Sequence, residues 1–337
     1  MSSAGEGQGL QQDEVIRDQH GAPVTRPNFA TVIGTRGSEL ALWQARHIQA
    51  LLGGEAAGVG LQIIKTRGDL MLDVPLQHQL DKGFFTKELE AALLDGRVDI
   101  AVHSLKDLPT QMPQGLVLAV VPERADVNDV LFVHKEAYDP SRPLPVKAGA
   151  KVGTASMRRK SLLQHVAPDV EATFLRGNVP TRLNKAKTGE LDAVILARAG
   201  VSRLGLDTGD LVVLDLDPLL WLPAAAQGAL GIQCRGGDAK TLKILEKIAN
   251  PDAALEVSLE RELLQRMEGG CHSPFGALAS VTGTTAVLRA GTVDALDRWV
   301  SVQVQGTTSE VAGLAEVALR AALAKEQVWA RPALPWE

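Results

Sequence analysis

The 337-residue sequence is poor in cysteine and in aromatic residues, and these shortages exclude several classes of protein. With two cysteines and no Cys-x-x-Cys or His-x-x-x-His pair, neither a disulfide framework nor a metal site is predicted. An aromatic content of 4% and a net charge of -5 argue against a nucleic-acid surface of basic patches and stacking rings. No stretch approaches the ~20 apolar residues that a membrane span requires. We therefore expect a cytoplasmic protein with neither nucleic-acid nor membrane partners.

The first 28 residues are polar and lack the basic start and apolar run of a signal peptide. We interpret residues 1–28 as a disordered N-terminal extension. Their Gly5-Glu6-Gly7-Gln8-Gly9 run follows no strand, and no Gly-Lys-Ser/Thr loop exists elsewhere, so nucleotide binding is not predicted.

Similar patterns recur in two halves of the chain, which is long enough for more than one domain. Short apolar runs at 96–102 and 189–195 are typical of buried parallel strands. Strand-turn-helix patterns begin at Ile33 and Val152. The sequence therefore predicts two α/β lobes, one from 29–124 plus 225–244 and the other from 125–224.

A third, smaller α+β domain is expected from 245–337. A helical pattern at 253–267 leads to a glycine-rich turn, and alternating segments at 286–290 and 299–304 precede a last helix at 310–324. We expect the ligand site in the cleft between the two lobes.

The two cysteines have different surroundings. Cys271 lies in the turn Gly269-Gly270-Cys271-His272, where the thiol is open to attack. Cys234 lies in an apolar run and is interpreted as a buried strand residue. Cys271 is therefore the candidate for chemistry.

Arginines and serines at strand-turn-helix junctions predict a site for carboxylate or phosphate groups. Backbone N–H groups at a helix start favour anions, and the planar guanidinium matches a carboxylate bidentately. Ser38 and Ser156, each taken alone, are better explained as helix N-caps. The alternative for the arginines is a solvated face, although their clustering favours a site. The arginines in question are Arg36, Arg158, Arg159, Arg176, Arg182 and Arg203.

Lys106 and Asp107 directly follow a predicted buried strand and so lie at its carboxyl end, where ligands bind in open α/β sheets. A carboxylate there can stabilise a developing cation. The alternative is a surface ion pair of little energy. His103 is interpreted as a hydrogen-bonded core histidine, and Lys82, in a glycine turn before a helix, is placed to reach a ligand.

Five separated motifs, in order and in register from about residue 29 to the end, resemble the porphobilinogen deaminase family, also called hydroxymethylbilane synthases. They are the run 35–45 beginning Thr35-Arg36-Gly37-Ser38, His103-Ser104-Leu105-Lys106-Asp107, Arg158-Arg159, the run 175–183 beginning Leu175-Arg176-Gly177-Asn178, and Gly269-Gly270-Cys271.

The resemblance implies three domains, namely two α/β lobes like those of periplasmic-binding proteins and a third that bears the cysteine. It also implies a transferase of tetrapyrrole and heme biosynthesis with a covalent dipyrromethane cofactor. Such an enzyme joins four porphobilinogen molecules to this primer, losing ammonia each time, and then releases hydroxymethylbilane by hydrolysis. Each pyrrole carries an acetate and a propionate, which suits the many arginines. Nothing in the sequence demands more than a monomer.

The resemblance also assigns roles residue by residue. Cys271 is implied to hold the cofactor through a thioether, and Asp107 to be the catalytic carboxylate that stabilises the cationic azafulvene left when ammonia departs. The implied cofactor-binding residues are Lys82, Lys106, Ser156, Arg158, Arg159 and Arg182. The implied substrate-binding residues are Arg36, Ser38, Arg176 and Arg203.

Two positions depart from the family pattern. Ala226 replaces the first glycine of a Gly-Gln-Gly segment that connects the lobes, which puts the flexibility of that connection in question, and Glu39 stands where proline is common.

Two other functions stay open on the residues alone. A bilobal module could capture an anionic solute without chemistry, although Cys271 argues against it, and a transferase of the same architecture could use another substrate with several carboxylates.

Overall fold

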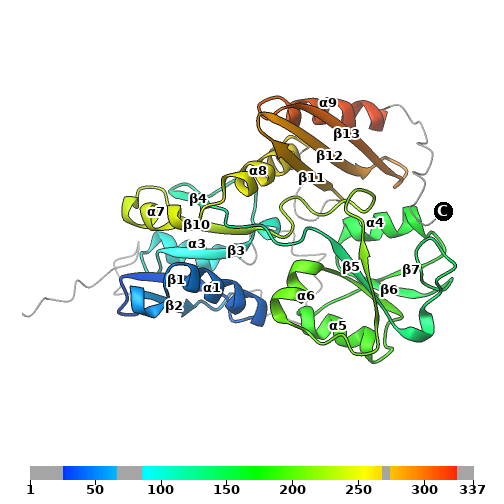
Figure 1. The fold of residues 1–337 in the computed structure, drawn as a ribbon, viewed down its shortest axis with the longest axis horizontal. Helices are drawn as coiled ribbons and strands as arrows, with labels where there is room; N and C mark the ends of the chain where they lie inside the picture. The colour runs from blue at the N-terminus through cyan, green and yellow to red at the C-terminus, as the bar shows by residue number, and fades with distance from the viewer. Residues whose placement is uncertain (1–25, 67–85, 268–273, 325–337) are drawn as a thin grey trace, which may run out of the picture.

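The structure, a computed structural model, describes residues 26–66, 86–267 and 274–324. Two α/β lobes lie side by side, and a third body lies against both of them (Figure 1). The turn that contains Cys271, the segment that contains Lys82 and most of the N-terminal extension lie outside the described residues.

Lobe 1 is a five-stranded sheet of order β2-β1-β3-β10-β4. Strands β1 and β2 run parallel, as do β1 and β3, whereas β10 is antiparallel to both its neighbours. Its strands are β1 (Thr31–Thr35), β2 (Val59–Ile63), β3 (Ile100–Ser104), β4 (Leu116–Val120) and β10 (Leu230–Arg235), and its helices are α1 (Glu39–Leu51), α3 (Lys87–Leu94) and α7 (Ala239–Leu245). Strand β1 is completely buried and β3 almost completely, as expected for central parallel strands.

Lobe 2 repeats this arrangement with the order β7-β6-β8-β5-β9. Strands β6, β7 and β8 run parallel, and β5 is antiparallel to β8. The chain enters lobe 2 from lobe 1 just before β5. Its strands are β5 (Asp129–Val133), β6 (Lys151–Thr154), β7 (Glu171–Phe174), β8 (Ala193–Ala197) and β9 (Val212–Leu216), and its helices are α4 (Met157–Val166), α5 (Val179–Lys187) and α6 (Arg198–Leu204). The predicted pair of α/β lobes is confirmed.

The C-terminal domain is an antiparallel sheet, β11-β12-β13, with two helices. The strands are β11 (Gly276–Thr282), β12 (Thr285–Val293) and β13 (Trp299–Thr307), and the helices are α8 (Pro251–Arg266) and α9 (Val311–Ala324). Both helices contribute to the core of this domain, with Leu259 and Leu263 from α8 and Leu319 from α9. The smaller α+β domain is as predicted.

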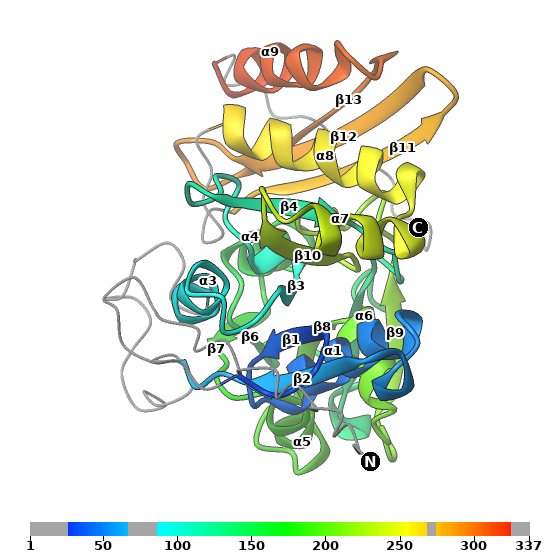
Figure 2. The same ribbon diagram turned by 90° about the vertical axis from the view of Figure 1, so that its left-hand side faces the viewer.

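Helix α8 is covered on two sides. It lies between the C-terminal sheet and the strands β4 and β10 of lobe 1 (Figure 2). On the side away from its own sheet, Ala253 and Val257 pack in a cluster that includes Leu105, Leu108 and Ala226. The C-terminal domain is thus in direct apolar contact with the residues that follow β3 and with residues 217–229, the crossing segment that leads from β9 of lobe 2 back to β10 of lobe 1. Among the described residues, no helix is long and apolar enough to cross a membrane.

Candidate functional site

Most of the predicted site residues of the two lobes lie just beyond the carboxyl ends of parallel strands, the edge at which open α/β sheets bind ligands. Arg36 follows β1, and Lys106 and Asp107 follow β3. In lobe 2, Arg158 and Arg159 follow β6 and Arg176 follows β7, whereas Arg182 lies within α5 and Arg203 in the last turn of α6.

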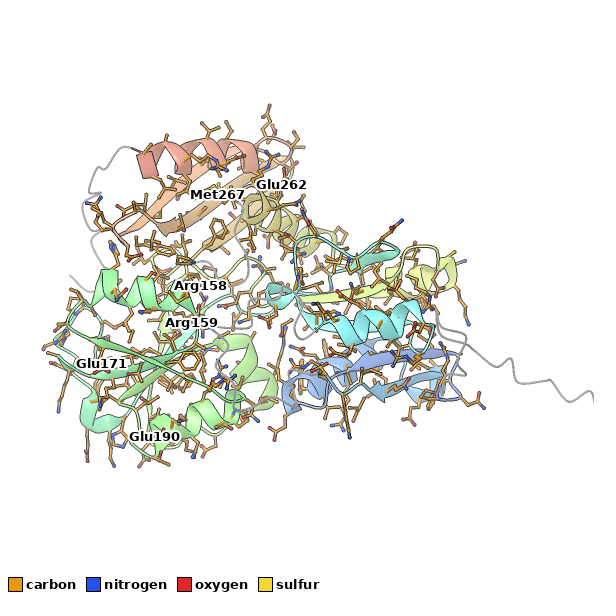
Figure 3. All side chains as sticks on the ribbon, turned by 180° about the vertical axis from the view of Figure 1, so that it is seen from behind. Arg158, Arg159, Glu171, Glu190, Glu262 and Met267 are labelled. Carbon is orange, nitrogen blue, oxygen red and sulfur yellow. The ribbon has the colours of Figure 1, made fainter. Side chains whose placement is uncertain are left out.

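Arg158 and Arg159 converge although they are adjacent on a helix. Both lie in the first turn of α4, whose N-cap Ser156 accepts a hydrogen bond from the Arg159 backbone N–H at 3.4 Å. The Arg158 Nη1 donates to the Leu222 carbonyl at 2.7 Å, and the Arg159 Nη1 donates to the Ile195 carbonyl at 2.9 Å. Figure 3 shows the two side chains on the part of lobe 2 that is turned toward the C-terminal domain.

Both guanidinium groups meet at Asp129, a fully buried carboxylate at the start of β5. Its Oδ2 lies 2.9 Å from the Arg158 Nη1, and its Oδ1 accepts from the Arg159 Nη2 at 2.7 Å. The Trp221 Nε1 donates to Oδ2 at 3.0 Å. Burial alone would raise the pKa of Asp129, but the two arginines hold it well below its ordinary value. Asp129 is therefore an ionised anchor for both arginines, and the sequence analysis missed it.

Gln227, in the crossing segment, connects this anchor to lobe 1. Its Nε2 donates to the Asp129 Oδ1 at 2.8 Å and to the Val127 carbonyl at 2.7 Å. Its Oε1 accepts from the Lys106 Nζ at 3.2 Å. Burial lowers the pKa of Lys106 to about 8, and the positive charges of Arg159 and Arg158 contribute, whereas Asp107 and Asp129 oppose the shift. Lys106 thus stands among cations of the opposite lobe.

Asp107 and Arg182 face the same region from opposite lobes. Asp107 ends a short 3-10 helix, Leu105–Asp107, and is exposed. The Arg182 Nε donates to the Gly177 carbonyl at 2.7 Å. Burial and the charge of Arg159 lower the pKa of Arg182, and the charge of Asp107 opposes this. The structure therefore brings together Lys106, Asp107, Arg158, Arg159 and Arg182.

The other predicted residues have different surroundings. Ser38 is the N-cap of α1 and accepts from the Ala41 N–H at 3.4 Å. His103, beside Arg36, is buried and hydrogen-bonded to Gln233 at 3.1 Å, as expected for a core histidine. Arg176 is half-buried beyond β7.

Arg203 contacts lobe 1 directly. Its guanidinium carbon lies 5.7 Å from the centre of the Trp43 ring, and its Nη2 donates to the Gly228 carbonyl at 2.7 Å. Burial lowers the pKa of Arg203 to about 10. These contacts place Arg203 at the seam between the lobes, and its role in substrate binding stays a prediction.

The arginine pair suits an anionic group. The Nε atoms of Arg158 and Arg159 are buried and have no hydrogen-bond partner within the part of the chain that the structure describes. Unpaired buried donors are costly, and each of these side chains is cationic. Four cations gather around Asp107 and Asp129, namely Lys106, Arg158, Arg159 and Arg182. This excess of positive charge fits a cofactor with several carboxylates.

Comparison with known proteins points to one family for both parts of the chain. Residues 31–243 match the family model "Porphobilinogen deaminase, dipyromethane cofactor binding domain", and residues 254–324 match "Porphobilinogen deaminase, C-terminal domain". A porphobilinogen deaminase of Nitratidesulfovibrio vulgaris is 47% identical over 255 residues, which are 75% of this chain and 78% of the relative. One from Trichlorobacter lovleyi is 42% identical over 286 residues, which are 84% of this chain and 89% of the relative.

Among solved structures, the chain is similar to a periplasmic binding protein from Brucella ovis with glutathione bound, at 13% identity and a TM-score of 0.40. The alignment covers 72% of this chain and 69% of the Brucella chain. The family models and the relatives cover both lobes and the C-terminal domain at much higher similarity. The chain belongs to the porphobilinogen deaminase family.

Proposed function

We propose that the residues gathered between the lobes carry out the porphobilinogen deaminase reaction, with Asp107 as the catalytic carboxylate. The cations around it would bind the carboxylates of the dipyrromethane cofactor and of the growing chain. The observation that carries this proposal is the pair of carboxylates within the cationic set. Asp129 is buried and engaged by Arg158, Arg159, Gln227 and Trp221, whereas Asp107 is exposed.

The arginine pair is the proposed holder of the cofactor. Its members are fixed from one side by Asp129 and by backbone carbonyls, and their buried Nε atoms can donate to a carboxylate. The Ser156 hydroxyl accepts a hydrogen bond as N-cap and keeps its own O–H as a donor. When bound, the dipyrromethane supplies the pyrrole carbon to which the first substrate unit is joined.

Further holders of the cofactor complete the proposal. Lys106 and Arg182 would add positive charge from opposite lobes. Lys82 and the thioether at Cys271 are proposed from the family motifs, because both residues lie outside the described part of the chain. Arg36, Ser38, Arg176 and Arg203 would bind substrate carboxylates on the same basis.

Asp107 would act on the substrate itself. When the C–N bond of the aminomethyl group breaks and ammonia leaves, positive charge spreads over the substrate pyrrole and its N–H becomes a stronger donor. A carboxylate that accepts this N–H stabilises the cation. The neighbouring cations Lys106 and Arg182 would oppose charge development, so a nearby negative group is required. Of the two carboxylates in the site, Asp107 is the one that is exposed.

The Asp107→Asn variant tests this role. We expect turnover of porphobilinogen, measured as ammonia released per cofactor-bearing protein, to fall about 100- to 1000-fold, because an amide cannot balance the cation. The melting temperature and the attached cofactor mass should stay unchanged. Asp252→Asn, which alters an exposed acid in the first turn of α8, is the matched control and should keep parental turnover. Turnover of Asp107→Asn near that of the control would refute the assignment.

We also propose that the enzyme works as a monomer in the cytoplasm. One chain supplies all the residues gathered at the described site, so no second copy is needed to complete it. Sedimentation equilibrium of the holoenzyme checks the first point, and a dimer at micromolar concentration would contradict it.

A further inference from the structure

One arginine of the C-terminal domain binds the turn that carries Asp107. Arg261 lies on α8 and is only 9% exposed. Its Nη1 donates to the Leu108 carbonyl at 2.8 Å and to the Leu105 carbonyl at 3.3 Å, and its Nη2 donates to the Pro109 carbonyl at 2.7 Å. These three carbonyls bracket Lys106 and Asp107 in the sequence.

We propose that Arg261 is a positioning residue for the reaction, which holds the Asp107 turn in place from the C-terminal domain. The proposal rests on the proposed role of Asp107. Arg261 donates to backbone atoms on both sides of the catalytic carboxylate, and it would act only through the orientation of that turn.

The turn has little structure of its own to fix it. A 3-10 helix of three residues has poor hydrogen-bond geometry, and this one closes with the Leu108 N–H on the Leu105 carbonyl at 3.2 Å. The Leu105 N–H donates to the Ala229 carbonyl at 3.0 Å, which holds the entry to the turn. The exit is held by Arg261, because the Leu108 and Pro109 carbonyls both accept from it.

The guanidinium shape matters for this contact. Its planar fork presents several N–H donors in fixed directions and stays charged when buried. A lysine ammonium offers donors from one point only. Leu105 and Leu108 also pack in one buried cluster with Ala253 and Val257 of α8, so apolar contact accompanies the polar one. Loss of the fork would leave the Leu108 and Pro109 carbonyls without this donor.

The preceding residue of α8, Glu260, holds the crossing segment through its carboxylate, which accepts hydrogen bonds. Both Glu260 oxygens accept from Arg124 at 2.9 Å, and they also accept from the Ala226 N–H at 2.6 Å and the Ala279 N–H at 3.0 Å. Two consecutive residues of one helix therefore fix the crossing segment and the catalytic turn. Helix α8 ends at Arg266, shortly before Cys271 in the sequence. The helix that holds the Asp107 turn is therefore also the one that leads to the proposed cofactor cysteine.

The test compares Arg261→Met with a matched loss of an arginine far from the turn. Arg235→Met is the control, because Arg235 also donates to two backbone carbonyls, those of Leu93 and Val98, each at 2.7 Å. We expect Arg261→Met to lower kcat per cofactor-bearing protein about 10- to 100-fold with KM within about twofold, since misplacement of a catalytic group acts on the chemical step. Arg235→Met should lower the melting temperature to a similar extent and keep kcat within about twofold of the parent.

A double variant separates positioning from general stability. If Arg261 acts through Asp107, adding Arg261→Met to Asp107→Asn should lower the remaining turnover less than about twofold, because the group to be positioned is already lost. A full additive loss would overturn the proposal, as would an Arg261→Met kcat equal to that of Arg235→Met. Arg261→Lys covers the case in which the methionine variant does not fold. It retains the charge without the fork and should still lower kcat, and parental kcat would again overturn the proposal.

The outcomes also distinguish this inference from the proposed function. Near-parental turnover of Asp107→Asn refutes the catalytic role of Asp107 itself. An inactive Asp107→Asn beside a fully active Arg261→Met refutes only the positioning role.

Discussion

Replacement of Asp129 by asparagine removes the negative charge that compensates two buried arginines. The carboxylate is fully buried, with the Arg158 Nη1 at 2.9 Å and the Arg159 Nη2 at 2.7 Å. An asparagine of the same shape that keeps its oxygen toward Arg159 turns its NH₂ group toward the Arg158 and Trp221 donors. Removing one partner of a buried ion pair typically costs about 3–5 kcal/mol. We expect a loss of unfolding free energy in this range, since Trp221 and Gln227 also lose an anionic acceptor.

Thermal unfolding of Asp129→Asn beside Asp215→Asn measures this loss. Asp215, which is exposed, lies opposite Val130 on the neighbouring strand β9 and accepts from the Nε of the half-buried Arg198 at 2.8 Å. Such an exposed pair contributes at most about 1 kcal/mol. At about 2–4 °C per kcal/mol, the melting temperature should fall by at least about 6 °C in Asp129→Asn and by less than about 4 °C in the control. Equal, small losses in both variants would refute the view of Asp129 as the anchor of the arginine pair.

Three further predictions concern two positions of the crossing segment and a core histidine. Gly228→Ala should melt far below the parent, because the backbone φ is +85° and a Cβ would lie 2.3 Å from the Ala125 carbonyl oxygen. The melting temperature of Ala226→Gly should equal or exceed that of the parent, because Ala226 has φ of 61°, a left-handed conformation that costs alanine about 1 kcal/mol. A melting temperature of Ala226→Gly below that of the parent would contradict this account. Burial lowers the pKa of His103 from 6.5 to about 4, so its neutral form is favoured in the folded state. Its contribution is fully present above pH 6.5 and is lost as the pH falls toward 4, by about 3 kcal/mol in total. His103→Gln should therefore flatten the fall in melting temperature between pH 7.5 and 4.5, and identical profiles for parent and variant would argue against a buried neutral histidine.

Local patterns in the sequence were enough to locate the lobes and most of the arginines. A strand, a turn and a helix start are each visible within a few residues, so the edge of the sheet that carries Arg158 and Arg159 could be predicted. Adjacent helix residues diverge by roughly 100°, and only the first turn of a helix allows both to point one way. Both residues do lie in the first turn of α4, where Asp129 draws them together.

Asp129 itself gave only a weak local signal, an acid at the head of the buried run Val130–Val133. Its partners Arg159, Trp221 and Gln227 lie 30, 92 and 98 residues away in the sequence. A continuous buried strand that starts with an unpaired acid must find its cations elsewhere in the fold, and the sequence does not say where.

Glu260 and Arg261 illustrate the same limit on a helix. In the sequence they are two charges of a helical pattern, which is usually a solvated face. Both are buried because α8 is covered by its own sheet on one side and by the residues after β3 on the other. Burial on two sides depends on how domains pack, and periodicity within one helix does not report it.

The most direct test of the central claim is the intact mass of the purified protein beside that of Cys271→Ser. If the protein is a porphobilinogen deaminase that carries its cofactor on Cys271, the parent should show the added mass of two linked pyrroles and the serine variant should lack it. A parent without added mass, both as purified and after incubation with porphobilinogen, would contradict the account.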